Sequence, residues 1–192
     1  MEFILLSMMA GLFLASYTLW KKGRGDKGER SRPRPELPPA ERTIHTLQIG
    51  DVASYLNVDY VIEGVLTLDE DGRVTRLYRM TDGSKVRWLA ARPGDDGPIL
   101  LDEAPEPVLD AAGADTLIYQ GTPHRLTARG SAHVTRAGIL GTGRSGDRMR
   151  LYEYAGPGGE RVLALAWTGG ERTDVFRGER LSPHAVDLLP GQ

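Results

Sequence analysis

The chain has 192 residues, with 24 lysines and arginines against 26 aspartates and glutamates, which leaves a net charge of −2. With 40% hydrophobic and 26% charged residues, the composition is that of a globular domain and excludes a wholly disordered chain. Because there is no cysteine, disulfides, thiolate metal sites and thiol nucleophiles are also excluded.

The first feature in chain order is residues 3–20, an apolar segment without charge. An α-helix of that length covers roughly 27 Å, near the short end of what crosses a bilayer. Tyr17 and Trp20 stand at its C-terminal end, where amphipathic rings favour the headgroup region. We therefore predict that residues 1–22 are a transmembrane helix in contact with membrane lipid. A buried core helix and a cleaved signal peptide are the alternatives.

Charge on either side of this segment predicts its direction in the membrane. Glu2 is the only side-chain charge before it, whereas these basic residues follow it: Lys21, Lys22, Arg24, Lys27, Arg30, Arg32 and Arg34. Since basic residues beside a membrane span stay in the cytoplasm, we expect a single-pass protein of the inner (cell) membrane, with its N-terminus outside and its domain cytoplasmic. The same basic residues could contact anionic lipid, or serve only as the topology signal.

Residues 23–42 are polar, basic and rich in glycine and proline, which predicts an extended linker. From Thr43 onward the charge changes sign, with 21 acidic and 16 basic residues. An acidic surface gains nothing from releasing the counterions of nucleic acid, so no nucleic-acid partner is expected. Residues 43–192 are expected to form one soluble β-domain.

Short alternating runs separated by turn residues predict strands through this domain and no helix. On the first of them, Tyr60, Ile62, Leu66 and Leu68 are expected to share one face. Residues 92–115 are expected to form a loop, and 173–176 and 185–189 are expected to be edge strands. The other predicted strands are 58–68, 73–81, 85–91, 116–119, 123–128, 131–137, 148–154 and 160–167.

A weak internal repeat accompanies these strands. Residues 76–80, a turn and 86–89 resemble residues 150–154, a turn and 162–167, and strand pairs beginning near 49–51 and 119–121 precede them. Aromatic hairpins also resemble one another by chance. The predicted fold is all-β, an antiparallel sandwich or partly open barrel, with two similar half-domains if the repeat is real.

Two kinds of sequence pattern could bind ligands, but each has a simpler interpretation. Residues 141–146 match GxGxxG, yet the residues that follow alternate as a strand instead of opening a helix, which favours a long hairpin. The acidic turns at 69–72 and 95–97 lack the ligand spacing of a calcium loop.

The chain has four histidines: His45, His124, His133 and His184. His124 and His133 could approach across a hairpin and hold zinc, although surface histidines are the more ordinary interpretation. No residue is therefore predicted as catalytic, cofactor-binding or metal-binding, and no cofactor is expected.

Several of these residues resemble the DUF4178 family, a domain of unknown function. The resemblance rests on 49–51, on the strand 60–64, and on the later strand 152–154, and it covers about 48–189. The resemblance implies a bacterial protein. Members of the family tend to occur near membrane-stress proteins, which implies a role in the membrane-stress response.

Together these features predict a membrane-anchored, non-enzymatic module that binds or assembles with a protein partner. The alternative is a small-molecule sensor or enzyme with its site between two β half-domains.

Overall fold

The computed structural model describes residues 42–104, 113–141, 147–168 and 173–191. The chain divides into two units, Met1–Pro39 and Ala40–Gln192, of which the first lies outside the described ranges. Among the residues described, no helix is long and apolar enough to cross a membrane, and the predicted anchor at 1–22 is not among them. The predicted boundaries of anchor and linker therefore stay predictions.

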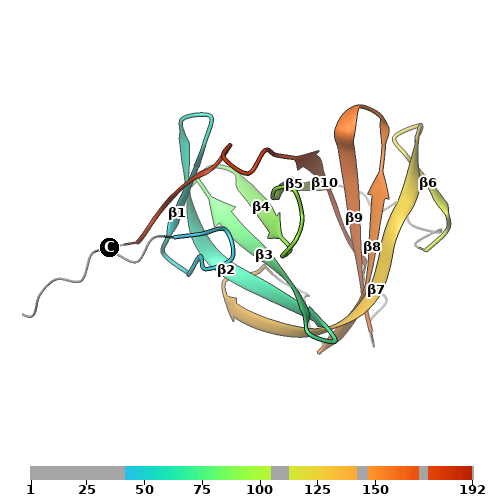
Figure 1. Ribbon diagram of the computed structural model, residues 1–192, viewed down its shortest axis with the longest axis horizontal. Coiled ribbons are helices and arrows are strands. Elements are labelled where there is room, and N and C mark those ends of the chain that lie inside the picture. Colours follow the sequence, from blue (N-terminus) through green and yellow to red (C-terminus); the bar gives the residue numbers. More distant parts are fainter. Residues whose placement is uncertain (1–41, 105–112, 142–146, 169–172, 192) are drawn as a thin grey trace, which may run out of the picture. The chain divides into compact units, whose positions relative to one another are not determined.

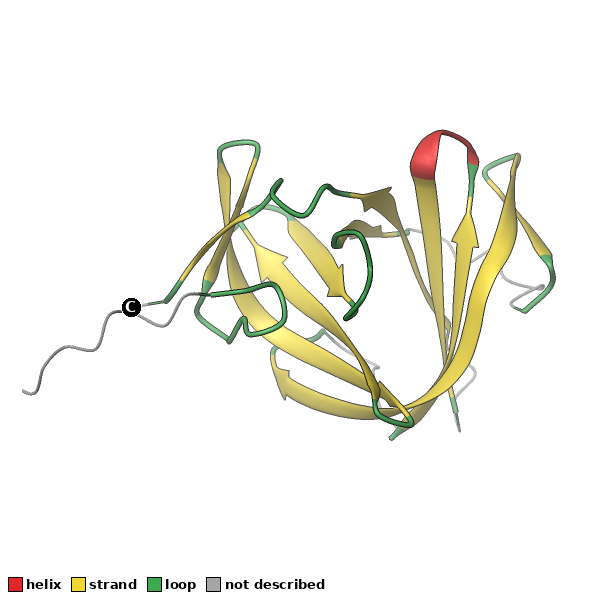
Figure 2. Ribbon diagram, viewed as in Figure 1, coloured by secondary structure: helices red, strands yellow, loops and turns green. Residues whose placement is uncertain are grey.

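The described part of the second unit is built from strands, with a single 3-10 turn, η1 (Pro157–Gly159) (Figure 2). The strands are β1 (Val52–Tyr55), β2 (Val58–Glu70), β3 (Arg73–Thr81), β4 (Val86–Ala91), β5 (Ile99–Glu103), β6 (Thr116–Tyr119), β7 (Thr122–Gly138), β8 (Arg148–Ala155), β9 (Glu160–Trp167), β10 (Thr173–Arg180) and β11 (Asp187–Leu189). The prediction of an all-β antiparallel domain is confirmed.

Eight of these strands close into a barrel in the order β2-β3-β4-β5-β10-β9-β8-β7, and β7 pairs back onto β2 (Figure 1). Strands β1 and β11 extend the sheet beyond β2, and β6 extends it beyond β7. The predicted sandwich or partly open barrel is thus a closed barrel. The barrel closes through two strand pairs, β2–β7 and β5–β10. Because these strands are far apart in sequence, no local sequence pattern predicts their pairing.

Three hydrophobic cores result from this arrangement. The interior core fills the barrel, where the rings of Trp88 and Phe176 meet edge to face at 5.4 Å. Its other members include Leu66, Leu68, Leu77, Leu101, Met149, Leu151, Leu163, Leu165 and Trp167. A second core lies on the outer side of β2–β5, with Tyr60, Ile62, Tyr78, Met80, Leu89 and Leu100. A third lies on the outer side of β7–β10, with Leu117, Tyr119, Tyr154, Val162 and Val175.

The two longest strands pass from an outer core to the interior core by means of a β-bulge. In β2 the register shifts between Ile62 and Gly64, so the extra residue Glu63 reverses the alternation of side chains. Tyr60 and Ile62 therefore belong to the outer core, whereas Leu66 and Leu68 lie inside the barrel. The prediction that all four share one face is wrong, because the bulge has no signal in the hydrophobic pattern.

The halves β1–β5 and β6–β10 repeat the same plan, as the internal similarity suggested. Each begins with a hairpin whose two turn residues have positive φ, Leu56-Asn57 in the first half and Gln120-Gly121 in the second. Each then has a bulge at the same distance beyond the turn, at Glu63 and at Thr127. Such turns match the right-handed twist of the strands that they join.

Register identifies equivalent residues in the two halves. Arg79 pairs with Gly64, the residue after the first bulge, and with Trp88 on its other side. Glu153 pairs with Ala128, the residue after the second bulge, and with Leu163. Trp88 therefore corresponds to Leu163, and the tryptophans of the two similar segments, Trp88 and Trp167, are not equivalent.

Three predicted elements differ from the observed ones. Strand β5 lies inside the expected loop 92–115, and the strands expected at 123–128 and 131–137 are one continuous strand, β7. Strand β10 is central in the barrel and not an edge, since it pairs with both β5 and β9. The edge position expected for 185–189 is confirmed by β11, which pairs only with β1 in the described structure.

Candidate functional site

Packed side chains occupy the barrel interior, so its two ends and its outer surface are where a ligand or partner can reach it. Trp88, Leu101 and Leu165 at the centre are fully buried, as expected for an eight-stranded barrel whose interior is just wide enough for side chains. Each tryptophan of this core donates its indole N–H to a carboxylate at 2.9 Å: Trp88 to Glu103, and Trp167 to Asp174.

One end of the barrel carries an ion-pair network around Glu153, whose side chain is 9% exposed. Its carboxylate lies 3.4 Å from Arg92 Nη1, 3.7 Å from Arg161 Nε and 3.6 Å from Arg180 Nη2. Arg92 belongs to the loop after β4 and the other three residues to the second half, so these charges bind the halves together. Arg180 also contacts Asp95 at 3.0 Å, which holds the β4–β5 loop over this end.

A cavity of about 160 Å³ adjoins this network. It lies between the segment at Ile44 and His45, the β4–β5 loop and Pro183. The Nδ1 atom of His45 is buried there and has no hydrogen-bond partner in the part of the chain that the structure describes. Because a buried polar atom without a partner costs free energy, this nitrogen favours a bound polar group or water in the cavity.

Two open grooves lie on the outer surface. One, of about 360 Å³, runs along the β5–β10 seam, where Arg87 donates to Asp102 and Glu160 and Arg177 face each other at 4.0 Å. The other, of about 420 Å³, lies on β7 and β8 beside Arg129, Ser131, Arg150 and Tyr152.

Exposed apolar side chains concentrate on one part of the domain. Six of the seven large hydrophobic residues that are exposed in the described structure lie on or beside the β1–β2 hairpin and β11: Ile49, Leu56, Val58, Val61, Ile139 and Leu189. We call these six residues the hairpin surface. Ile118 on β6 is the seventh.

Register places part of the hairpin surface in one row. Val52 pairs with Leu189 on one side and with Val61 on the other, so the three side chains project from the same face of β11, β1 and β2. Ile139 joins this region through its backbone N–H, which donates to the Glu63 carbonyl at 2.8 Å.

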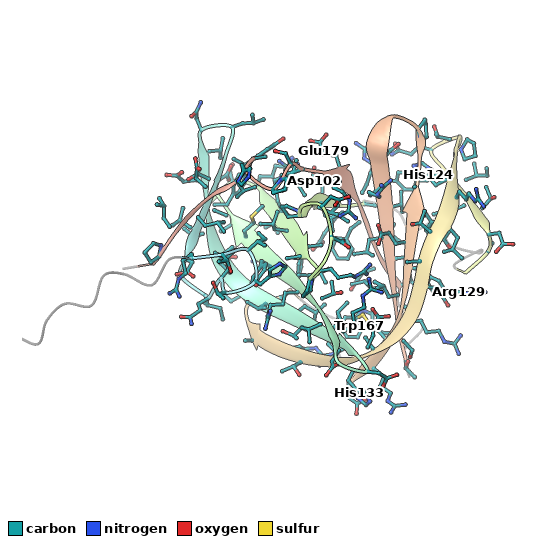
Figure 3. All side chains as sticks on the ribbon, viewed as in Figure 1. Asp102, His124, Arg129, His133, Trp167 and Glu179 are labelled. Carbon is teal, nitrogen blue, oxygen red and sulfur yellow. The ribbon has the colours of Figure 1, made fainter. Side chains whose placement is uncertain are left out.

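The histidines predicted as a possible zinc pair lie far apart on β7, with His124 near the start of the strand and His133 in its second half (Figure 3). Nine residues of strand separate them by roughly 30 Å, so they cannot share a metal. His124 is fully buried, with Nδ1 3.0 Å from the Thr122 carbonyl and Nε2 3.2 Å from Glu160. His133 is exposed and accepts a hydrogen bond from Arg148 at 3.0 Å, and His184 is exposed in the turn before β11.

The other tested patterns serve local structure. The backbone N–H of Gly72 donates to Asp69 within the β2–β3 turn, at 2.7 Å. The glycine-rich segment joins β7 to β8, which pair with each other, although 142–146 lie outside the described residues. Within the residues described, no group of three or more histidines and carboxylates could hold a metal ion.

Sequence reasoning missed the arginines that line the β7–β8 groove. A signal was present, because Arg129, Ser131 and His133 alternate with small residues along one strand, and Arg148, Arg150 and Tyr152 alternate along the next. Alternation of period two places each set on one face. For the hairpin surface the signal is weaker, since alternation separates Val61 from Tyr60 and Ile62 but all three residues are apolar.

Comparison with known proteins places most of the domain in one family. The model described as "Domain of unknown function (DUF4178)" matches residues 48–183. No curated protein and no solved structure matches the chain.

Proposed function

We propose that this chain, which belongs to the DUF4178 family of unknown function, is a non-enzymatic protein-interaction module tethered to the cytoplasmic face of a membrane. The hairpin surface carries this proposal. A partner that covers it removes exposed apolar area from water, which is the main favourable term in most protein association.

The contrast with the second half supports a specific role for this surface. Val52 and Val61 pair across the first hairpin, and the equivalent residues of the second hairpin are Thr116 and Arg125. At the turns, exposed Leu56 corresponds to Gln120. The fold therefore accepts polar residues at all three positions, so apolar side chains in the first half are not required for the backbone.

Membrane tethering is proposed from the sequence of residues 1–42. The uncharged segment 3–20 has the length of a membrane span, and the basic residues that follow it favour a cytoplasmic position for the domain. Tethering would confine the hairpin surface to a layer near the bilayer and raise its effective concentration toward a membrane-bound partner.

The proposal is tested by changing single residues in the full chain, purified in detergent from its own cells. Val61→Arg installs the residue type that the second half carries at the equivalent position, and we expect the partner to be lost. Ile118→Arg adds the same charge at an exposed apolar residue in the other half and should leave the partner bound. Equal recovery of partner with both variants would contradict the proposed surface.

A second candidate, a small-molecule sensor, follows from the cavity beside the Glu153 network. About 160 Å³ is enough for a small organic ligand, and the unpaired Nδ1 of His45 supplies a polar contact. Native mass spectrometry of the full chain would detect a retained ligand. His45→Trp should remove that ligand by filling the cavity, and a wild-type chain of unliganded mass would count against this candidate.

A further inference from the structure

The outer face of β7 and β8 carries three arginines in neighbouring positions. Pairing sets Arg129 opposite Tyr152, Ser131 opposite Arg150, and His133 opposite Arg148. The arginines therefore form a diagonal ladder on the two strands, with hydroxyl groups beside them. Neighbours of this kind lie within reach of one ligand, since diagonal positions are about 7–8 Å apart.

Among the residues that the structure describes, no carboxylate pairs with Arg129 or Arg150. Within the described chain, the guanidinium groups of Arg129 and Arg150 form no ion pair or hydrogen bond, and Arg148 donates to His133. The Glu70 carboxylate does lie against Gly130, but on the interior side, because Gly130 alternates with the buried Ala132 and Val134. The groove of about 420 Å³ is thus cationic although the domain as a whole is acidic.

The equivalent face of the first half is built differently. Register places Val65 where the second half has Arg129, and the fully buried Tyr78 where it has Tyr152. Val65 packs against the outer core there. In the second half, Arg129 stands on the outer side of the barrel (Figure 3), and Tyr152 stays partly exposed in the groove.

We propose that this groove binds the phosphate of an anionic glycerophospholipid headgroup and so docks the second half of the barrel on the bilayer. Guanidinium forks match phosphate oxygens in pairs, and the hydroxyl of Tyr152 can donate to a remaining oxygen. The Ser131 hydroxyl donates to the Met149 carbonyl at 3.5 Å. The inference rests on the proposed membrane tether but not on the hairpin surface.

The length of chain before the domain is compatible with this occupant. Residues 21–41 separate the apolar segment from the described domain. A chain of that length spans roughly 25 Å if flexible and about 65 Å if fully extended as polyproline, so the groove can reach headgroups of the same membrane.

The test uses the full chain in vesicles of phosphatidylcholine, alone or with about one third phosphatidylglycerol to supply anionic headgroups. Modification of individual arginines by phenylglyoxal is followed by mass spectrometry. Phosphatidylglycerol should slow the modification of Arg129 and Arg150. It should leave Arg125 unchanged, because Arg125 is exposed on the same strand but faces the opposite side across the bulge at Thr127.

A variant and a third condition separate lipid from free phosphate. Arg129→Gln should weaken the protection of Arg150 about fivefold, the factor expected for one arginine near an anionic surface, whereas Arg125→Gln should not. Inorganic phosphate added to phosphatidylcholine vesicles should protect neither residue. Equal protection by inorganic phosphate, equal protection of Arg125, or no protection by phosphatidylglycerol would each overturn the proposal.

Failure of the tether has its own readout. A chain that does not float with phosphatidylcholine vesicles lacks the proposed anchor. A chain that floats but shows no protection has the anchor without the headgroup site, and the effect of Val61→Arg on the partner is unaffected by either result.

Discussion

The first half of the barrel, β1–β5, and the second half, β6–β10, place turns and bulges at equivalent positions but carry different side chains on them. The first half has Val52, Val61 and Leu56 where the second has Thr116, Arg125 and Gln120. The second has a cationic groove where the first has a covered apolar face. Backbone geometry is thus common to both halves, whereas surface chemistry is specific to each.

The same comparison applies to the charged residues that lie opposite the two bulges, on the partner strands. Glu153 in the second half corresponds to Arg79 in the first, and Arg79 pairs with Glu63. Three arginines surround Glu153, whereas in the described structure Arg79 pairs with Glu63 alone. Equivalent positions in the two halves therefore carry opposite charges and different numbers of ion-pair partners.

The largest effect is expected for Glu153→Gln. The change leaves three arginines at the barrel end with one carboxylate fewer, and breaking a buried network of this kind costs about 3 kcal/mol of unfolding free energy. Glu63→Gln, in the more exposed pair of the first half, should cost about 1 kcal/mol or less. Chemical denaturation of the two variants measures both values, and equal losses would show that the network adds no more than a surface pair.

A smaller loss is expected for Gly64→Ala. An added Cβ would lie 2.2 Å from the Ile139 carbonyl oxygen, which is backbone and cannot move aside easily. We expect a loss of about 2 kcal/mol from this overpacking. The equivalent residue of the second half is Ala128. Ala128→Gly should cost only about 0.5–1 kcal/mol, through backbone entropy, so similar losses at both positions would contradict the described contact.

Tyr78→Phe should stabilise the domain by about 1 kcal/mol near neutral pH, because the buried hydroxyl has no hydrogen-bond partner among the described residues. Burial raises the pKa of Tyr78 from 10.0 to about 12. The tyrosine of the unfolded chain therefore loses its proton at a lower pH than the folded one. The unfolding free energy of the wild-type chain is unaffected by this difference below pH 10 and falls as the pH rises from 10 to 12.

The corresponding measurement is the denaturation midpoint of both chains from pH 8 to pH 12, a range that runs from below the ordinary pKa of 10.0 to the raised pKa of about 12. The advantage of Tyr78→Phe should widen above pH 10. A constant difference across this range would show that the hydroxyl titrates as it does in the unfolded chain.

The smallest effect is expected at the hairpin turns. Leu56 has a φ of 51° and Gln120 a φ of 48°, a region that asparagine adopts more readily than either residue. Leu56→Asn and Gln120→Asn should each raise the unfolding free energy by about 0.5 kcal/mol. Thermal unfolding compares them, and a gain at one turn only would show that the turns are not energetically equivalent.

Much of the strand content could be predicted, because β6 alternates exposed and buried side chains and β3 lies between two clear turns. Strand β5 was missed for a physical reason. Ile99, Leu100 and Leu101 are all buried, since one side of β5 faces the interior core and the other faces an outer core, and no alternation results.

Closure of the barrel could not be predicted, because it depends on the pairing of β2 with β7 and of β5 with β10. The hairpin surface was not predicted either, since Tyr60, Val61 and Ile62 are all apolar and the outer core covers only Tyr60 and Ile62. The arginines of β7 and β8 could have been predicted to share one face, because they recur with the two-residue period of a strand.

The central claim, that the first half carries the partner surface, is tested most directly by photo-crosslinking in living cells from two equivalent positions. A photoreactive amino acid replaces Val61 in one chain and Arg125 in another, which are matched by register in the two hairpins. The account predicts an adduct of this chain with a different protein from position 61 and none from position 125. An adduct from position 125 alone, or adducts that contain only two copies of this chain, would contradict it.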